Sequence, residues 1–369
     1  ASLGRATVGY VVSVMGIGPV VVAVRWRRVR RSSLYETFRL LYDTHMSNDS
    51  TIHSYTLDTV VDEVRRYSGF TNKAPISGVK AFFDPTDPIH GPGDDGAIVH
   101  VDDHNVVVCG EALSPSFVDG DPHGAGIAAV LANVNDVAAM GGVPLGIVNT
   151  VVGPPEVTAE VMRGMVDASK MYDVPIVGGH LTEQPGPTSL SAFAVGHAEQ
   201  VLSMANVREG QTVLFACFLD GHMRPDFPFF TSIDNQAHRF ARDVRVLAQV
   251  AARGAAVSAK DVSMAGALGS LAMLLEFSGL GAEIRLADMP VPDATDFLQW
   301  LIAFPSYAFW LTAEPDQAEN CIGIFTDNDL TCVSVGTVTG GSSLQLQHSA
   351  DSAELIDFAS ESVTGLWAN

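Results

Sequence analysis

Acidic side chains interrupt apolar segments at four places in this chain. Asp94 and Asp95 lie in a tight Gly-Asp-Asp-Gly turn before an apolar strand, and Glu111 follows a strand end, where α/β folds place ligands. Asp136 lies inside an apolar helical segment, where a polar group costs free energy unless it is paired or binds something. Asp261 directly precedes another helical segment. Carboxylate oxygens are the ligands that Mg²⁺ prefers, and the metal then meets phosphates.

Each of these acids also has an ordinary structural interpretation. Asp and Gly together make turns, so Asp94 and Asp95 fit a turn alone. Glu111 fits a solvated surface acid, and Asp261 fits an N-terminal helix cap. Taken singly, none of them assigns a function.

Polar residues accompany the acids at two of the four places. Asn133 and Asn135 share the apolar helical segment with Asp136, and Lys260 precedes Asp261. Elsewhere, the sequence Gly178-Gly179-His180 follows a short apolar strand. Paired glycines let backbone N–H groups approach a phosphate closely, although the pair alone is weak evidence.

Alternating helical and strand patterns position these residues in the first half of the chain. Apolar spacing predicts a helix over residues 57–67, and two β-rich runs at 97–101 and 106–109 predict a hairpin. The remaining expected elements are helices at 124–140 and 159–172 and strands at 145–152, 174–177 and 191–197.

The second half of the chain also alternates between helical and strand patterns. It predicts helices at 235–253, 263–277, 295–302 and 316–322, strands at 212–218, 282–286, 309–312 and 332–338, and a closing helix at 352–362. The expected fold class is α/β (α+β) with two domains. The predicted divisions are an N-terminal extension at 1–50, an ATP- and Mg²⁺-binding domain at 51–205, a C-terminal α/β domain at 206–345, and a C-terminal helix or tail at 346–369.

The amino-acid composition limits the classes of function that are open to this chain. A hydrophobic share of 47% with 17% charged residues is typical of a globular protein. The formal charge of −21 argues against nucleic-acid binding, which needs clustered Lys and Arg. Four cysteines without a CxxC pair indicate reduced core thiols in a cytoplasmic protein: Cys109, Cys217, Cys321 and Cys332.

The first 50 residues carry a different signal. Residues 7–24 have no charge, and five arginines follow between Arg25 and Arg31. The run is near the lower limit for a membrane-spanning helix, and Gly16, Gly18 and Pro19 weaken it. We expect an extension without a part in the chemistry, with a targeting segment or membrane attachment through the first 35 residues as the alternatives.

Five segments in order resemble the aminoimidazole ribonucleotide synthetase-like (PurM-like) superfamily. They are GDDGAIV, CGEA, LANVNDVAAMGGVP, VPIVGGHLTEQPG and KDVSMAGALGSLAMLLEFSGLGAEI. The resemblance covers residues 57–340, and NVNDVAAMGGVP is its most specific piece. It implies two α/β domains, a homodimer in which the N-terminal domains form a β-barrel, and an ATP- and Mg²⁺-dependent reaction on a small-molecule substrate.

The resemblance also implies roles for individual residues. The expected metal ligands are Asp94, Asp95, Glu111, Asp136 and Asp261, with Glu111 standing where the family usually has Asp. The expected cofactor-binding residues are Asn133, Asn135, Gly178, Gly179 and Lys260, and the expected catalytic residues are Asp136, Asp261 and His180. No GxxxxGK[ST] loop is present, so carboxylates and metal must replace a lysine cradle.

Departures from the family patterns leave the substrate open. Selenophosphate synthetase would need a reactive Cys before the Gly-Asp-Asp turn, and no Cys precedes Gly93 here. The hydrogenase maturation protein HypE carries a terminal Cys, and this sequence ends in Asn369. The turn Ser263–Gly266 lacks the Asp expected in a thiamine-monophosphate kinase, which stays an alternative. The leading hypothesis is an ATP-dependent phosphotransferase or synthetase. The other alternative is a nucleotide-binding subunit or scaffold without its own chemistry.

Overall fold

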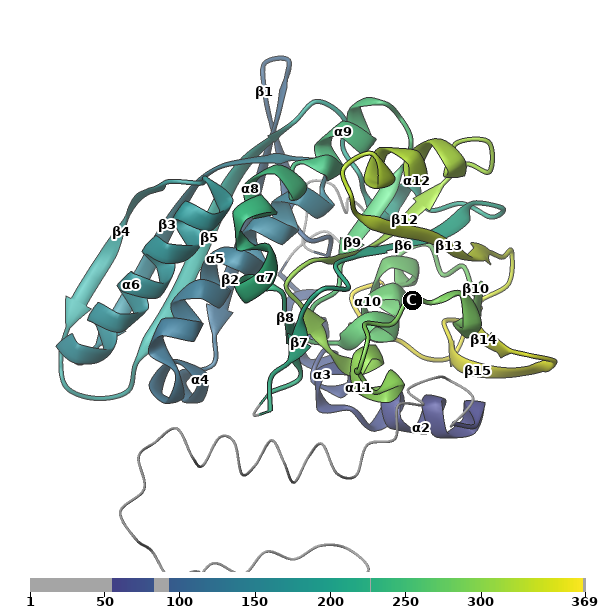
Figure 1. Cartoon of the computed structure of the whole chain (residues 1–369), viewed down its shortest axis with the longest axis horizontal. Helices are drawn as coiled ribbons and strands as arrows, with labels where there is room; N and C mark the ends of the chain where they lie inside the picture. The colour runs from purple at the N-terminus through teal and green to yellow at the C-terminus, as the bar shows by residue number, and fades with distance from the viewer. Residues whose placement is uncertain (1–54, 83–92, 226, 368–369) are drawn as a thin grey trace, which may run out of the picture. The chain divides into compact units, whose positions relative to one another are not determined.

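Two mixed β-sheets with helices against them organise the chain in a computed structural model (Figure 1). The structure describes residues 55–82, 93–225 and 227–367. The predicted extension at 1–50, with its uncharged run and arginines, therefore lies outside the described residues. Among those that are described, no helix has the length and apolar character needed to cross a bilayer.

A short helical region opens the described chain. Helix α2 (Leu57–Arg66) confirms the expected helix, because Thr56 caps its first turn and Val60 and Val64 are buried. Two shorter elements follow, α3 (Ser68–Thr71) and the 3₁₀ helix η2 (Ala74–Val79).

The first sheet has the strand order β1-β2-β5-β3-β4. Its strands are β1 (Ala97–Val101), β2 (His104–Leu113), β3 (Val143–Gly153), β4 (Ile176–Glu183) and β5 (Ser189–Ala198). β1 and β2 form the expected hairpin, and the only parallel pair in this sheet joins β3 to β4. Helices α5 (Pro122–Ala139) and α6 (Pro155–Tyr172) lie side by side across one face (Figure 1), and α4 (Pro115–Gly120) precedes α5.

The other face of this sheet carries apolar side chains that are exposed. Along β5, the buried Ala192 and Ala194 alternate with the exposed Phe193 and Val195, as the two-residue period of a strand requires. Further exposed apolar residues on this face come from the neighbouring strands: Val99, Val101, Val108, Leu145, Val148 and Val177. Over the described residues the sheet is open, with β1 and β4 at its edges, and the predicted barrel of two chains stays a prediction.

The second sheet has the order β15-β14-β10-β13-β6-β12-β9. Its strands are β6 (Thr212–Cys217), β9 (Ser258–Asp261), β10 (Ala282–Arg285), β12 (Ala308–Ala313), β13 (Thr331–Val338), β14 (Ser343–His348) and β15 (Asp351–Asp357). A small third sheet joins β7 (His222–Met223), β8 (Phe229–Thr231) and β11 (Phe304–Pro305). The longer helices of this half are α9 (Val246–Ala252), α10 (Gly266–Glu276), α11 (Phe297–Ile302) and α12 (Ala318–Thr326).

The predicted closing helix at 352–362 is wrong, because this segment contains strand β15. β15 pairs with β14 at the edge of the second sheet, and this pairing overrides local propensity. A bulge opposite Leu344 and Gln345 places Leu355 and Ile356 both in the core, although they are adjacent. Consecutive buried residues hide the alternation that identifies a strand.

The single helix predicted at 235–253 is also wrong. The segment divides into α7 (Ile233–Gln236), the 3₁₀ helix η4 (Ala237–Arg239), α8 (Phe240–Asp243) and α9. Arginine side chains in this segment bond to carbonyl oxygens of other elements: Arg245 donates to Tyr172 O at 2.9 Å, and Arg239 donates to Asn328 O at 2.7 Å. These tertiary bonds fix short helical pieces in place of one continuous helix.

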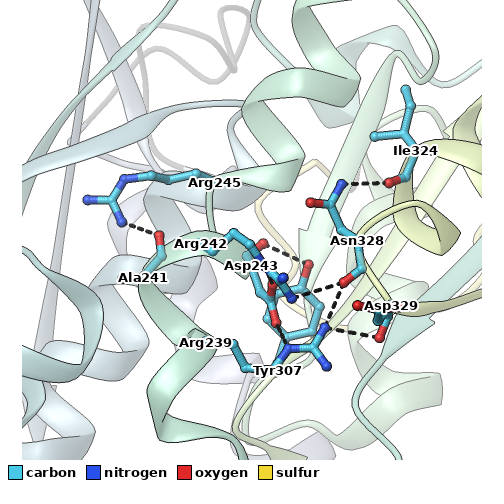
Figure 2. Close-up of polar contacts among 9 residues, drawn as sticks. All are labelled: Arg239, Ala241, Arg242, Asp243, Arg245, Tyr307, Ile324, Asn328 and Asp329. Carbon is cyan, nitrogen blue, oxygen red and sulfur yellow. Dashed lines mark hydrogen bonds and ion pairs between the residues drawn. The ribbon is translucent and has the colours of Figure 1, made fainter.

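A buried carboxylate lies at the centre of this arginine cluster (Figure 2). Asp243 is fully buried and accepts from Arg239 Nε at 2.5 Å and Arg242 Nε at 2.6 Å. Arg239 and Arg242 also bond to Asn328 O, beside the end of α12, and the hydroxyl of Tyr307 donates to Asp243 O. The cluster therefore ties α8 to β13 and β12 through their connecting segments.

We predict that Asp243→Ala lowers the free energy of unfolding by about 2 kcal/mol, because two arginines lose a charged hydrogen-bond acceptor. Urea denaturation followed by circular dichroism measures this change. The matched control is Asp288→Ala, which removes an exposed pair with Arg285 and should cost less than about 1 kcal/mol. Equal losses in both variants would contradict the structural role of Asp243.

Candidate metal and nucleotide site

Three carboxylates from three elements converge at one point. Asp95 comes from the turn before β1, Asp136 from α5, and Asp261 from the end of β9. One ligand oxygen from each lies within 4.8 Å of the others. Such a set of oxygens has the chemistry of a divalent-cation site.

Asp95 connects the two halves of the described chain. β9 is an edge strand, and the backbone N–H of Asp261 donates to Asp95 Oδ2 at 3.0 Å. The ammonium group of Lys260 forms an ion pair with Asp95 Oδ1 and lies 3.1 Å from Asp261 Oδ1. Lys260 is only 8% exposed, so these are buried charge pairs.

The charges in this group shift one another's protonation. Burial raises the pKa of Asp95 to about 7, against the opposing effect of the Lys260 ammonium and with the added repulsion of Asp261. Burial alone would lower the pKa of Lys260, but the charges of Asp95 and Asp261 outweigh it and raise the pKa. Lys260 therefore stays charged.

Asp136 is the member of the group whose side chain has no partner within residues 55–82, 93–225 and 227–367. It is 6% exposed, it lines the cavity, and its side chain forms no hydrogen bond or ion pair with any described residue. Burial, and then the charges of Asp261 and Glu111, raise its pKa well above the ordinary value. A buried acid without a partner usually needs a ligand to offset its cost.

Asp94 forms hydrogen bonds with protein groups on both of its carboxylate oxygens. Its carboxylate accepts from Ser203 Oγ at 2.7 Å, from Met204 N at 3.0 Å and from Asp95 N at 3.1 Å. These bonds fix the turn that presents Asp95. The predicted role of Asp94 as a metal ligand stays a prediction.

The C-terminal segment supports the same turn. Glu276 of α10 accepts from the backbone N–H groups of Val363, Thr364 and Gly365, which holds this segment in place. Gly93 has a φ of +134°, and a Cβ there would lie 2.1 Å from the ring of Trp367. Only glycine fits this position, because the tryptophan packs directly on the backbone of the turn.

A cavity of about 1240 Å³ opens beside the three carboxylates. Glu111 lies on its wall, and its predicted role as a metal ligand stays a prediction. The aromatic part of the lining comes from Phe117, Phe227, Phe229 and Phe304. The space is large enough for a nucleotide with a second small molecule.

Sequence reasoning missed two cations of this cavity. Lys73 precedes η2, and its pKa is lowered by burial and then by the charge of Lys260. Arg224 pairs with Asp121 at 3.0 Å. Neither belongs to a motif that identifies a phosphate site, so only the folded chain reveals them.

The two predicted asparagines lie in the core and do not line the cavity. Asn133 Nδ2 donates to Ala129 O at 2.8 Å and to Ala192 O at 3.2 Å, which joins α5 to β5. Asn135 Nδ2 donates to Ser306 O at 3.2 Å, and its Oδ1 has no partner among the described residues. Their predicted contacts with the nucleotide stay predictions.

The predicted Gly-Gly-His turn lies apart from the carboxylates. Gly178, Gly179 and His180 belong to β4, the edge strand of the first sheet, and all three are exposed. His180 Nε2 lies 3.1 Å from Thr182 Oγ1, and none of the three residues lines the cavity. Within one chain, the structure does not bring them to Asp136 and Asp261.

Comparisons with known proteins agree on one family. The family described as "AIR synthase related protein" matches residues 93–198 with its N-terminal domain and residues 235–349 with its C-terminal domain. An uncharacterized protein of Synechocystis sp. is 30% identical over 74% of this chain and 86% of its own length. A thiamine-monophosphate kinase of Rhodopirellula baltica is 30% identical over 46% of this chain and 51% of its own length.

Solved structures share the fold. T. maritima PurL complexed with ADP superposes with a TM-score of 0.67 at 18% identity, covering 83% of this chain. This chain spans about half of that protein, at 51% of its length. AaThiL complexed with AMPPCP and TMP gives a TM-score of 0.55 at 18% identity, covering 71% of this chain and 91% of that one. With both domains matched in order, this chain belongs to the AIR synthase related family of the PurM-like superfamily.

Proposed function

We propose that the chain binds Mg-ATP in the cavity beside Asp95, Asp136 and Asp261 and transfers a phosphoryl group to a small molecule. The observation that carries this proposal is Asp136, which is buried, has no side-chain partner among the described residues and lies next to two further carboxylates. Solved relatives with the same fold hold ADP and AMPPCP, which supports a nucleotide as the ligand. The group fits Mg²⁺ because its carboxylate oxygens lie at close range, and those of Asp136 and Asp261 Oδ2 accept no hydrogen bond from the described residues.

In this proposal, each residue of the site has a distinct task. Asp136 and Asp261 hold the metal, which offsets charge on phosphate oxygens during transfer. Lys73 lies on the cavity wall without a side-chain partner among the described residues, so its ammonium is available to the phosphates. Lys260 keeps Asp95 and Asp261 in position.

The acceptor is proposed to bind in the aromatic part of the cavity, away from the carboxylates. The thiamine-monophosphate kinase relatives favour a kinase reaction, but the Ser263–Gly266 turn lacks the Asp expected for that activity. If the chain binds ATP and releases no ADP with any acceptor, the alternative of a nucleotide-binding subunit replaces this proposal.

Calorimetry with AMPPCP tests the nucleotide site. We expect binding in the presence of Mg²⁺ and none after chelation with EDTA. Asp136→Asn should weaken binding at least about tenfold, or about 1.4 kcal/mol, because one charged ligand of the metal is lost. The matched control is Asp316→Asn, an exposed acid outside the cavity lining, which should bind as wild type does. Mg²⁺-independent binding, or equal affinity in both variants, would contradict the proposal.

The pH dependence of cation binding follows from the raised pKa values. Burial raises the pKa of Asp95 to about 7, so below pH 7 the group carries an added proton and attracts a cation less strongly, and affinity should rise with pH from 6 to 8. Each displaced proton changes affinity by up to about tenfold per pH unit below the pKa. Titration with Mn²⁺ in two buffers of different ionisation enthalpy measures both affinity and proton release. An affinity that is constant from pH 6 to 8 would be the contrary result.

We also propose that two copies of the chain pair through the exposed face of the first sheet. That face presents Phe193, Val195, Val177, Val148 and Leu145, whereas α5 and α6 cover the opposite face. A contiguous exposed apolar surface of this kind is typical of an interaction site. Pairing of two open sheets would also complete the barrel that one chain does not form.

Light scattering after size-exclusion chromatography tests this pairing. We expect a dimer for wild type and a monomer for Phe193→Asp, because the charge is buried without a partner at the interface. Phe193 is 41% exposed; the matched control is Val166→Asp on α6, at 40% exposed, which should remain a dimer. A monomeric wild type, or dissociation of both variants, would exclude this surface.

A further inference from the structure

Lys260 occupies a position inside the carboxylate group itself. Its ammonium contacts Asp95 Oδ1 and lies 3.1 Å from Asp261 Oδ1, so it bridges these two carboxylates. Asp95 Oδ2 already accepts from the backbone of Asp261. Both oxygens of Asp95 are therefore engaged by protein groups.

The carboxylate oxygens that accept no hydrogen bond from the described residues belong to Asp136 and Asp261. Both carboxylate oxygens of Asp136 and Asp261 Oδ2 accept no hydrogen bond from any described residue. Asp136 is 6% exposed and lines the cavity, which makes it a buried acid without a hydrogen bond at the cavity wall. The oxygens of Asp136 and Asp261 are therefore open to one metal ion, while the ammonium group of Lys260 occupies the space between Asp95 and Asp261.

The net charge of the carboxylate group also favours a single divalent ion. When ionised, three carboxylates and one ammonium leave two negative charges, which a single divalent cation neutralises. A second divalent cation would make this buried group positive, and an uncompensated buried charge is costly. A triphosphate brings its own negative charges, and these remove that barrier.

We infer that Lys260 is a built-in cation that limits the nucleotide-free site to one divalent ion, so that any second ion enters only with the triphosphate. This inference rests on the proposed function, because it takes the carboxylate group to be the metal site. Lys260 is thus a positioning residue: it holds Asp95 and Asp261 together in the absence of metal and sets the metal count. The site keeps its geometry before substrate arrives.

Counting bound Mn²⁺ tests this role without measuring activity. The electron paramagnetic resonance signal of free Mn²⁺ reports how many ions each chain removes from solution. We expect one ion per chain for wild type without nucleotide and a second ion when AMPPCP is added. Lys260→Met removes the charge at similar volume and should bind two ions without nucleotide, whereas Lys260→Arg keeps the charge and should bind one.

Each other outcome has a distinct meaning. Two ions on nucleotide-free wild type, or one ion on Lys260→Met, would overturn the role of Lys260 and leave the metal site intact. No ion on wild type would overturn both this inference and the proposed function. Thermal unfolding establishes that the variants fold, and if Lys260→Met does not fold, the wild-type counts with and without AMPPCP decide.

Discussion

Repulsion among three buried carboxylates is the constraint on which this structure depends. Two unit charges within 4.8 Å repel by about 3 kcal/mol or more at an effective dielectric constant of 20. Asp95, Asp136 and Asp261 form three such pairs, which is a large cost for a fold of ordinary stability. Lys260 offsets part of this cost, and the pKa values of Asp95 and Asp136 are raised; in the proposed function, a metal offsets the remainder.

The scaffold explains how the chain holds this arrangement. The long helix α5 carries Asp136 and is fixed by Asn133 and Asn135, whose amides bond to carbonyls of β5 and of the segment before β12. Asp94 and Trp367 fix the turn that presents Asp95. Residues that the sequence marked as nucleotide contacts thus contribute to the site by holding its walls.

Much of the site was predictable because its acids stand in unusual local contexts. An Asp inside an apolar helix is costly without a purpose, so Asp136 stands out in the sequence, whereas Asp261 fitted a helix cap and the strand β9 that carries it was not predicted. Their convergence with Asp95 comes from the family resemblance, since spacing alone does not bring residues 95, 136 and 261 together.

The missed features depend on long-range contacts. Lys73 belongs to no motif and reaches the cavity only because the N-terminal helices pack against α10 and β15. The β15 strand has a bulge that disguises its alternation, and the helical segment after residue 233 is divided by bonds to distant carbonyls. Local sequence does not indicate partners that are distant in the chain, and for this reason helices were predicted at 352–362 and 235–253.

The position of a bound metal tests the central claim most directly. Crystals grown with Mn²⁺ and AMPPCP, measured at the manganese absorption edge, would give an anomalous peak for each ion. The account predicts a peak about 2.0–2.3 Å from carboxylate oxygens of Asp136 and Asp261, with Lys260 still bridging Asp95 and Asp261. Metal bound elsewhere, with Asp136 still lacking a ligand, would contradict it.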